Sequence, residues 1–493
     1  MILNRKLAIA LSLAIGTAFL SAQPAVKPES KRTLVRAGHL LDVKTGKLLD
    51  GQTIVVVGDT IQAIAPTASV PAMPGDKVVD LGGLTVLPGL IDVHTHLTMN
   101  TDFDPYHEVT STDAKEAING VVNARTTLMA GITTVRNVGA YGFTDVDLRD
   151  AINSGQIPGP HLQVSGPLLG ITGGHCDDNL LPIKYHAVGD GVADGIAAAQ
   201  HKVRENIKYG ADLIKICATG GVLSKGDDPQ ASQYTLEEMQ AIVADAHRLG
   251  RKVAAHAHGA QGILWATEAG VDSIEHGSYI NDEAIAEMKK RGTYLVPTLY
   301  LEDWMLEYGN LPPFYHQKML DTIAVAKNNI KHAMQAGVKI AMGTDAAVYP
   351  HGLNAHELDV YVNQLGMAPL TALQTATLNA ADLMGWTAKT GSLEPGKWAD
   401  IIAVEKNPVD DVKTLQDVKF VMKAGVVYKD QGIGNRAQGT GNRAQKSDRS
   451  YKCDRRLDNR TEILYGCFLR DSTWLWRRPI PLCVRSWLGF WTR

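Results

Sequence analysis

A regular alternation of short apolar strands with loops and helices constrains the fold of this chain more than any other feature of its sequence. The first strand leads into His94, and seven further apolar stretches follow at 133–138, 161–166, 213–217, 253–258, 273–276, 294–297 and 339–343. Helical stretches such as 231–249 and 322–336 lie between them. Short buried strands alternating with helices are typical of a parallel sheet. The sequence therefore predicts an α/β fold, a (β/α)8 TIM-like barrel over residues 91–388.

Short strands of a different kind flank this region on both sides. Residues 33–37, 53–57 and 61–64 are rich in β-branched residues and are separated by turn signals, and 391–429 returns to the same pattern. We therefore expect a small β-sandwich domain built from two segments, 23–90 before the barrel and 389–430 after it.

The first 22 residues have the pattern of a secretory signal peptide. Arg5 and Lys6 precede an apolar stretch, 7–20, which ends in small residues near Ala22. This stretch is too short to span a bilayer, which disfavours a membrane anchor. The sequence thus predicts a periplasmic or secreted protein with no stable membrane association after cleavage.

The last segment, 431–493, differs in composition from the rest of the chain. It is rich in Arg and Trp and lacks hydrophobic periodicity, so we interpret it as an unstructured or non-native extension. The alternative is a basic, aromatic module for nucleic acid or membranes. The formal net charge of −3 gives no reason to expect nucleic acid as a partner. Cys176 and Cys217 lie in the predicted core, and the spacing of the cysteines does not indicate a disulfide framework.

Residues that can bind a metal stand at the ends of the predicted barrel strands. His94 and His96 are one residue apart, so an extended strand points both imidazoles the same way, as a zinc site needs. Later strand ends provide His256, His276 and Asp345. Because the carboxyl ends of barrel strands converge, we expect these side chains to meet in one site.

Lys215 lies inside the apolar strand 213–217, where a lysine is costly unless it is neutralised or paired. One interpretation is a buried salt bridge. The other follows from burial, which lowers the pKa of an amine and favours its neutral, nucleophilic form. A neutral amine can add carbon dioxide and become a carbamate, an anionic oxygen ligand able to bridge two metal ions.

Several motifs in this chain are similar to those of the amidohydrolase superfamily, in particular its exported Xaa-Pro dipeptidase and ochratoxinase-type branch. The likeness covers roughly residues 33 to 429, and its motifs are PGLIDVHTH at 88–96, LIKI at 213–216, EHG at 275–277, GTD at 343–345, TLNAA at 377–381 and GSLEPGKWAD at 391–400. The resemblance implies two divalent metal ions, zinc being the expected metal, bridged by carboxylated Lys215 and a hydroxide. His94, His96 and Asp345 would hold one ion, and His256 and His276 the other.

The resemblance also implies an activity, the hydrolysis of amide bonds in dipeptides or N-acyl amino acids, with ochratoxin-like amides among the candidate substrates. The hydroxide between the two ions would attack the carbonyl carbon, and Asp345 would act as general base and then as general acid toward the leaving nitrogen. Cys217 is interpreted as a packing residue. A homo-oligomer is possible.

Substrate contacts are predicted in the loops that follow the strands. By resemblance, His175 and Tyr234 are candidates to bind the free carboxylate of a dipeptide-like substrate, and His351 could line the mouth of the site. His258 matches no ligand position of the family and is interpreted as a supporting or structural residue. Asn137 stands where the family usually has aspartate, which removes a carboxylate near the site but no metal ligand.

Two other functions remain open from the sequence. One is a cyclic-amide hydrolase resembling imidazolonepropionase, a class that generally lacks the bridging lysine, so Lys215 disfavours it. The other is a non-catalytic scaffold on the same fold, which the complete set of six predicted ligands disfavours.

Overall fold

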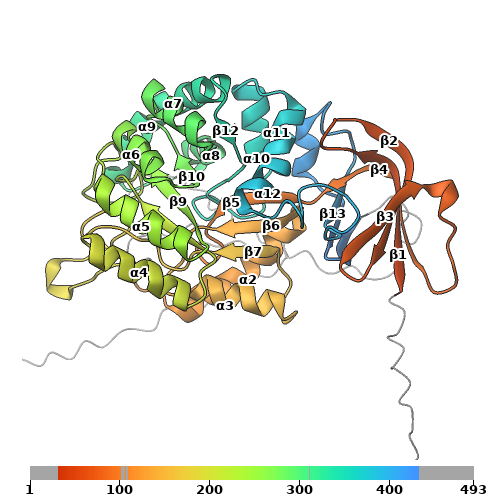
Figure 1. Ribbon diagram of the computed structural model, residues 1–493, viewed down its shortest axis with the longest axis horizontal. Coiled ribbons are helices and arrows are strands. Elements are labelled where there is room, and N and C mark those ends of the chain that lie inside the picture. Colours follow the sequence, from red (N-terminus) through yellow and green to blue (C-terminus); the bar gives the residue numbers. More distant parts are fainter. Residues whose placement is uncertain (1–30, 101–105, 107–108, 310, 432–493) are drawn as a thin grey trace, which may run out of the picture. The chain divides into compact units, whose positions relative to one another are not determined.

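The computed structural model describes residues 31–100, 106, 109–309 and 311–431. The predicted signal peptide, and the C-terminal extension apart from Gln431, lie outside these residues. Within them the chain forms one mixed sheet and two parallel sheets, and the helices lie on the outside of the parallel strands (Figure 1).

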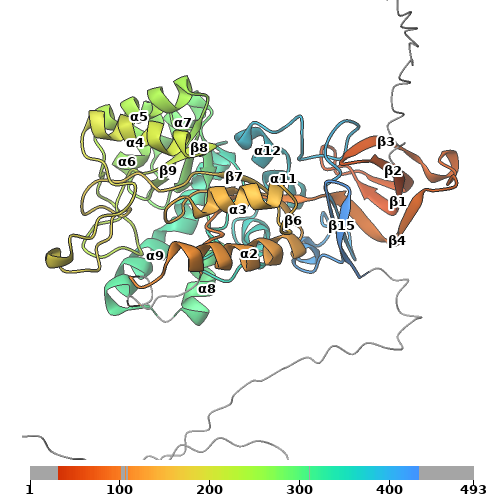
Figure 2. The same cartoon turned by 90° about the horizontal axis from the view of Figure 1, so that it is seen from below.

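The mixed sheet combines strands from both ends of the described chain. Its seven strands run in the order β15-β14-β13-β4-β1-β2-β3. The N-terminal strands are β1 (Arg32–Leu41), β2 (Leu48–Val57), β3 (Thr60–Pro66) and β4 (Lys77–Pro88), and the C-terminal strands are β13 (Ile401–Val404), β14 (Phe420–Lys423) and β15 (Val426–Asp430). Figure 2 shows β15 beside this group of N-terminal strands. The two segments on either side of the parallel strands therefore build a single sheet.

This sheet wraps around one apolar cluster to which both segments contribute. Val35, Ile54 and Val86 pack with Phe420 and Met422 in a cluster of fully buried side chains. The free edge at β3 also bonds back to the residues before β13, because Ile61 exchanges two main-chain hydrogen bonds, both of 2.8 Å, with residues 396 and 397. A sheet that covers its own apolar face in this way needs no other layer to bury it.

The two parallel sheets follow the predicted order of strands. One contains β5 (Leu90–Thr95), β6 (Ile132–Asn137) and β7 (His161–Val164). The other contains β8 (Leu213–Cys217), β9 (Lys252–Ala257), β10 (Ser273–His276), β11 (Tyr294–Val296) and β12 (Lys339–Ile340). The predicted α/β architecture with parallel strands is confirmed, and the strand bounds differ from the predicted ones by a few residues at most.

Hydrogen bonds join the two parallel sheets at both of their edges. After β7, Leu169 donates to the carbonyl of Lys215 (2.9 Å) and accepts from Cys217 N–H (2.8 Å). On the other side, Val93 of β5 donates to the carbonyl of Met342 just beyond β12 (2.9 Å). The edge strands of each parallel sheet are thus paired rather than left open.

Helices connect the parallel strands and cover them. They are α2 (Asp113–Met129), α3 (Thr144–Asn153), α4 (Ile196–Lys208), α5 (Leu236–Arg248), α6 (Ala260–Ala269), α7 (Asp282–Arg291), α8 (Tyr300–Tyr308), α9 (Pro313–Gln335), α10 (His356–Asp359), α11 (Pro369–Thr375) and α12 (Leu378–Met384). Short 3-10 turns lie at Thr67–Ser69, Ile183–Tyr185 and Val412–Gln416, and a π-helical turn lies at Val360–Gln364. The helix predicted from residue 231 begins only at Leu236, because Thr235 and Glu238 form a capping box that fixes its start.

The cysteines differ from the sequence-based expectation. Cys176, in the loop after β7, forms a disulfide with Cys217 at the end of β8. The cysteine pattern did not indicate a disulfide framework, and the interpretation of Cys217 as a packing residue only was wrong. Cysteine spacing does not reveal this pair, because the two residues are 41 positions apart and only the fold brings the loop to the strand end.

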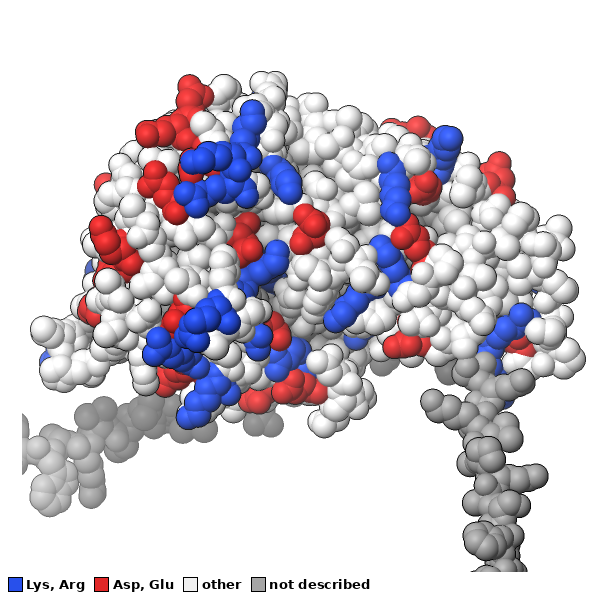
Figure 3. All heavy atoms as spheres, in the orientation of Figure 1, with Lys and Arg blue, Asp and Glu red and all other residues white. Residues whose placement is uncertain are grey.

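In the view of Figure 3, basic and acidic side chains are interspersed, and the face in view is not covered by charges of one sign. In the described part of the chain, no helix is both long and apolar enough to cross a membrane.

Candidate active site

A cavity of about 310 Å³ opens at the carboxyl ends of the parallel strands. Its lining contains all six predicted metal ligands and two further histidines, namely His94, His96, Lys215, His256, His276 and Asp345 together with His175 and His258. These residues come from four strands and from loops that are far apart in the sequence. The structure therefore brings the predicted ligand set together in one place.

One group of ligands surrounds the end of β5. Asp345 Oδ1 lies 3.4 Å from His94 Nε2 and 3.3 Å from His96 Nε2. Asp345 has a φ of +59°, a strained left-handed conformation that turns its carboxylate back toward the two imidazoles. Gly343 permits this approach, because a Cβ at that position would come within 2.6 Å of the His94 Cβ. The favourable charge pairing holds the pKa of Asp345 well below its usual range despite its burial.

Behind this group, a buried ion pair fixes the orientation of His94. Glu275 Oε2 lies 2.7 Å from His94 Nδ1, and Glu275 Oε1 accepts hydrogen bonds from Arg136 Nη2 (2.8 Å) and Ser273 Oγ (2.5 Å). Arg136 also donates to the carbonyl of Val93 (2.6 Å). Although burial opposes ionisation, Arg136 and His94 lower the pKa of Glu275 to about 2. Sequence reasoning missed the roles of Glu275 and Arg136, although Glu275 stands in the quoted EHG motif and Arg136 directly precedes Asn137.

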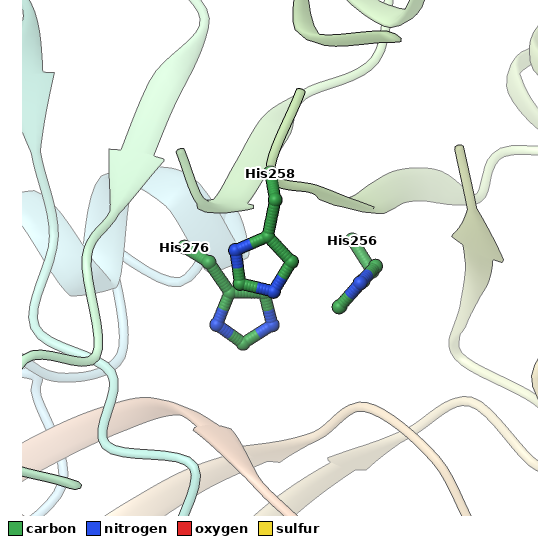
Figure 4. A group of neighbouring side chains, drawn as sticks. All are labelled: His256, His258 and His276. Carbon is green, nitrogen blue, oxygen red and sulfur yellow. The ribbon is translucent and has the colours of Figure 1, made fainter. Parts of the chain in front are cut away.

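A second group of imidazoles lies at the ends of β9 and β10. The ligand atoms of His256, His258 and His276 all lie within 4.8 Å of one another (Figure 4). The rings of His258 and His276 stack with centroids 4.9 Å apart and planes inclined by 15°. Hydroxyl groups hold their Nδ1 atoms, Ser278 for His258 and Thr298 for His276, both at 2.8 Å. His258, which the sequence did not place among the ligands, therefore belongs to this group by position.

The protonation states of these histidines suit metal binding. Burial and the repulsion between neighbouring imidazoles keep the pKa values of His256 and His276 well below the usual value, and burial lowers that of His258 to about 3. Neutral imidazoles offer a lone pair, as metal ligation requires. His94, His276 and Asp345 also have ligand atoms within 4.8 Å of one another. The donor set present in the cavity thus fits divalent metal ions.

Lys215 lies in the middle of β8 and reaches the same cavity with 1% of its surface exposed. Burial lowers the pKa of its amine to about 8, while the carboxylates of Glu275 and Asp345 act in the opposite direction. A substantial fraction of the amine is therefore neutral under mildly alkaline conditions.

Of the three predicted substrate contacts, the structure brings one to the cavity. His175 lines it, stacks on His256 with ring centroids 4.2 Å apart, and has Nδ1 2.8 Å from Ser224 Oγ. Burial lowers the pKa of His175 to about 4. Ser224 in turn donates to Asp227 (2.7 Å), which accepts from Lys318 Nζ (2.8 Å). This chain of hydrogen bonds ties the loop to α9.

Tyr234 and His351 do not belong to the cavity lining. The Tyr234 hydroxyl donates to the carbonyl of Gly170 (2.9 Å), so its polar atom is occupied by the backbone. His351 Nε2 lies 3.3 Å from the carbonyl of Met99, itself a lining residue. Loop residues are hard to place from sequence because no strand geometry fixes their direction.

Asn137, at the end of β6, supports the site from behind. Its Oδ1 accepts from Leu97 N–H (2.6 Å), and its Nδ2 donates to the carbonyl of Gly139 (3.0 Å) and to Asp145 (3.1 Å). Gly139 O also lies 3.1 Å from His96 Nδ1. The amide thus stabilises the loop against which His96 rests.

Comparison with known proteins agrees with this geometry. An amidohydrolase family model matches residues 85–429. The ochratoxinase of Aspergillus niger is 36% identical over 433 residues, which covers 82% of this chain and 88% of that protein. The crystal structure of a Xaa-Pro dipeptidase with methionine bound in its active site superposes with a TM-score of 0.76 at 37% identity, covering 81% of this chain and all of that one.

More distant similarity reaches another branch of hydrolases. Imidazolonepropionase of Pseudomonas entomophila is 26% identical over 410 residues, covering 76% of this chain and 92% of that protein. The family match spans most of the chain and includes every strand end that contributes to the cavity. This chain therefore belongs to the amidohydrolase family and is a hydrolase that acts on amide bonds.

Proposed function

We propose that this chain is an exported, binuclear metal-dependent amidohydrolase that cleaves dipeptides or N-acyl amino acids, ochratoxin-like amides among them. One observation supports this most directly: four imidazoles, Lys215 and Asp345 line a single cavity. The similarity to an ochratoxinase and to a Xaa-Pro dipeptidase favours substrates in which an acyl group is joined to the nitrogen of an amino acid.

Two sets of residues would hold the metal ions. His94, His96 and Asp345 would bind one, and His256 and His276 the other, with Lys215 as a carbamate between them; zinc is the expected metal. Divalent cations bound there would polarise the substrate carbonyl and lower the pKa of water. The proximity of His258 to His256 and His276 makes it a further candidate ligand for the second ion.

Asp345 is the proposed general base and general acid. Its side chain is 13% exposed and faces the cavity, and its low pKa keeps the carboxylate ionised at neutral pH, so that it can accept a proton. It would then pass that proton to the leaving nitrogen. Glu275 serves a different purpose, since its bonds to His94 and Arg136 hold the imidazole in one orientation.

His175 is the proposed contact for the free carboxylate of the substrate. It stands at the cavity wall next to His256, and its Nδ1 is held by Ser224. Ser224 donates its own proton to Asp227, so Nδ1 of His175 carries the proton of the neutral ring and donates to Ser224. Nε2 is not engaged by this bond and would donate to a carboxylate oxygen once the ring is protonated beside that negative charge.

The architecture is proposed to be a closed (β/α)8 barrel over 91–388 with a β-sandwich formed by 23–90 and 389–430. The hydrogen bonds at both edges of the parallel sheets support closure, and the shared apolar cluster supports the sandwich. The Cys176–Cys217 disulfide favours an oxidising location, in keeping with a cleaved signal peptide over 1–22.

The competing functions differ in their metal content and substrates. A cyclic-amide hydrolase of the imidazolonepropionase type would not need the buried amine of Lys215. A non-catalytic scaffold would not need the complete set of metal-binding side chains. The decisive experiment loads the purified full chain with zinc, with and without bicarbonate, and measures bound metal and hydrolysis of a dipeptide and N-acyl amino acid library. We expect two metal equivalents and cleavage of linear amides. Cleavage of imidazolone propionate alone, or a metal-free and inert protein, would contradict the proposal.

A further inference from the structure

One wall of the cavity contains a carboxyl group that the proposed chemistry does not use. Glu302 belongs to α8, lines the same cavity as the ligand set and is 6% exposed. Its Oε2 atom is shielded from solvent and has no hydrogen-bond partner in the described chain. Buried polar side chains nearly always form hydrogen bonds, because a group that leaves water without gaining a new partner loses its hydration free energy. An unpaired carboxyl oxygen at a cavity wall therefore indicates a missing ligand.

The charges near Glu302 have other partners. Lys327 of α9 forms an ion pair with Asp303, the residue next to Glu302. The N-terminus of α8 is also occupied, since the carboxylate of Glu357 accepts from the main-chain N–H groups of residues 299 and 300 at 2.8 and 2.6 Å. Among the residues that the structure describes, Glu302 is thus neither a helix cap nor part of a salt bridge.

The electrostatic surroundings favour a positive partner. Burial raises the pKa of Glu302 to about 8, and Glu357 and Asp303 act in the same direction while Lys327 opposes them. A cation placed against this carboxyl group would meet an acceptor that is poorly solvated and has negative neighbours.

The rest of this wall is mostly apolar. Leu301 and Met305 of α8 and Met319 and Ile323 of α9 line the same cavity as Glu302, and the polar residues that α9 adds are Tyr315 and Thr322. Lysine and arginine side chains combine an aliphatic stem with a charged tip, which matches an apolar wall with one carboxyl group in it.

We propose that Glu302 and this wall form a subsite for a cationic side chain of the substrate, of the lysine or arginine type, on one side of the scissile amide. The inference rests on the proposed amidase function and specifies its substrate class. An apolar substrate side chain would fit the wall but leave Oε2 of Glu302 unpaired, and an acidic one would lie near the negative charges of Glu357 and Asp303. Glu302 is a specificity residue here, without a part in the chemical step.

The test compares matched substrates on the metal-loaded full chain. Ala-Lys is paired with Ala-norleucine, and Lys-Ala with norleucine-Ala, so that each pair differs chiefly in the ammonium group. We expect kcat/KM to be at least about tenfold higher for the lysine member of one pair, and Glu302→Gln to reduce that ratio by about tenfold or more. A preference for norleucine in both pairs, or a ratio unchanged in Glu302→Gln, would overturn the subsite.

Glu307→Gln is the matched control, because Glu307 lies on the same helix with its side chain exposed and outside the cavity lining. Its substrate ratio should equal that of the unmodified chain. If neither pair is cleaved, the proposed amidase function fails on these substrates, and calorimetric binding of L-lysine amide against L-norleucine amide decides about the subsite. Selective binding of the lysine amide that Glu302→Gln abolishes supports it, and equal binding of both amides overturns it.

Discussion

Glu275 and His94 form a fully buried pair in which Oε2 of the carboxylate lies 2.7 Å from Nδ1 of the imidazole. The contact decides which nitrogen of His94 faces the cavity, because Nδ1 is occupied and Nε2 points toward Asp345. Arg136 neutralises the carboxylate from the other side. The orientation of a cavity residue thus depends on two side chains that are not part of the cavity lining.

Replacing Glu275 with Gln should therefore damage both the site and the fold. The guanidinium of Arg136 would remain buried without its counter-ion, which costs about 3–5 kcal/mol in the free energy of unfolding. Zinc affinity should fall by about 10- to 100-fold, because the amide no longer fixes the ring and its tautomer. Urea denaturation and competitive zinc titration measure the two effects. Glu237→Gln, an exposed position on α5, is the control, and unchanged zinc affinity in Glu275→Gln would contradict the prediction.

Lys215→Met should separate metal binding from packing. The thioether side chain keeps most of the volume of the lysine but cannot become a carbamate or hold a charge, so the two-metal site should be lost together with amide hydrolysis. The metal-free variant should be at least as stable as the metal-free parent, because folding no longer has to remove an amine from water. Metal analysis and thermal unfolding after chelation test both points. Lys289→Met, exposed on α7, should change neither, and a fully loaded, active Lys215→Met variant would exclude the proposed bridge.

The ligand set could be predicted from the sequence because strand geometry is nearly fixed. Alternation places His94 and His96 on one face, and parallel strands carry their carboxyl ends to one side, so residues more than two hundred positions apart meet. The same rule placed Lys215 and His276. Long-range pairing between side chains has no such rule. Glu275 contacts a histidine 181 positions away, and nothing in its local sequence indicates that partner.

Loop residues show the other limit of sequence reasoning. His175 and Tyr234 were predicted on equal grounds. His175 lines the cavity, whereas the Tyr234 hydroxyl donates a hydrogen bond to a backbone carbonyl. Glu302 could not be singled out at all, because an acidic residue near a helix N-terminus is usually explained by the helix dipole. Only the structure shows that Glu357 already satisfies that terminus.

Breaking the Cys176–Cys217 disulfide should destabilise the loop that presents His175. The bond links residues 41 positions apart, and a closed loop of that length contributes roughly 3–4 kcal/mol when it restricts the unfolded chain. Cys176→Ser should therefore lower the melting temperature and raise KM more than it lowers kcat, because His175 directly precedes Cys176 in the chain. Thermal unfolding with and without dithiothreitol measures the effect. The melting temperature of the Cys176→Ser/Cys217→Ser double variant should not change with dithiothreitol, because this disulfide is already absent. An unmodified protein with the same melting temperature with and without dithiothreitol would contradict the prediction.

Asn137→Asp should make stability depend on pH, because Asn137 donates to Asp145, a buried carboxyl group. Burial already raises the pKa of Asp145 to about 6, and its hydrogen bonds and Arg149 only partly oppose this. A second carboxyl group at 137 would replace an N–H donor with a like charge and raise the pKa further. Carboxyl groups with raised pKa values keep their protons in the native state, so the free energy of unfolding falls as the pH rises above the unfolded-state value of about 4.

The variant should accordingly be close to the parent in stability near pH 5 and less stable by about 1–3 kcal/mol near pH 8. Denaturation by urea at both pH values gives the comparison. Asn137→Asp/Asp145→Asn is the internal control, because it restores one amide and one carboxyl group and should recover most of the lost stability. An equal loss of unfolding free energy at pH 5 and pH 8 would contradict the prediction, because it would show that Asn137 stabilises the fold through packing and not through charge.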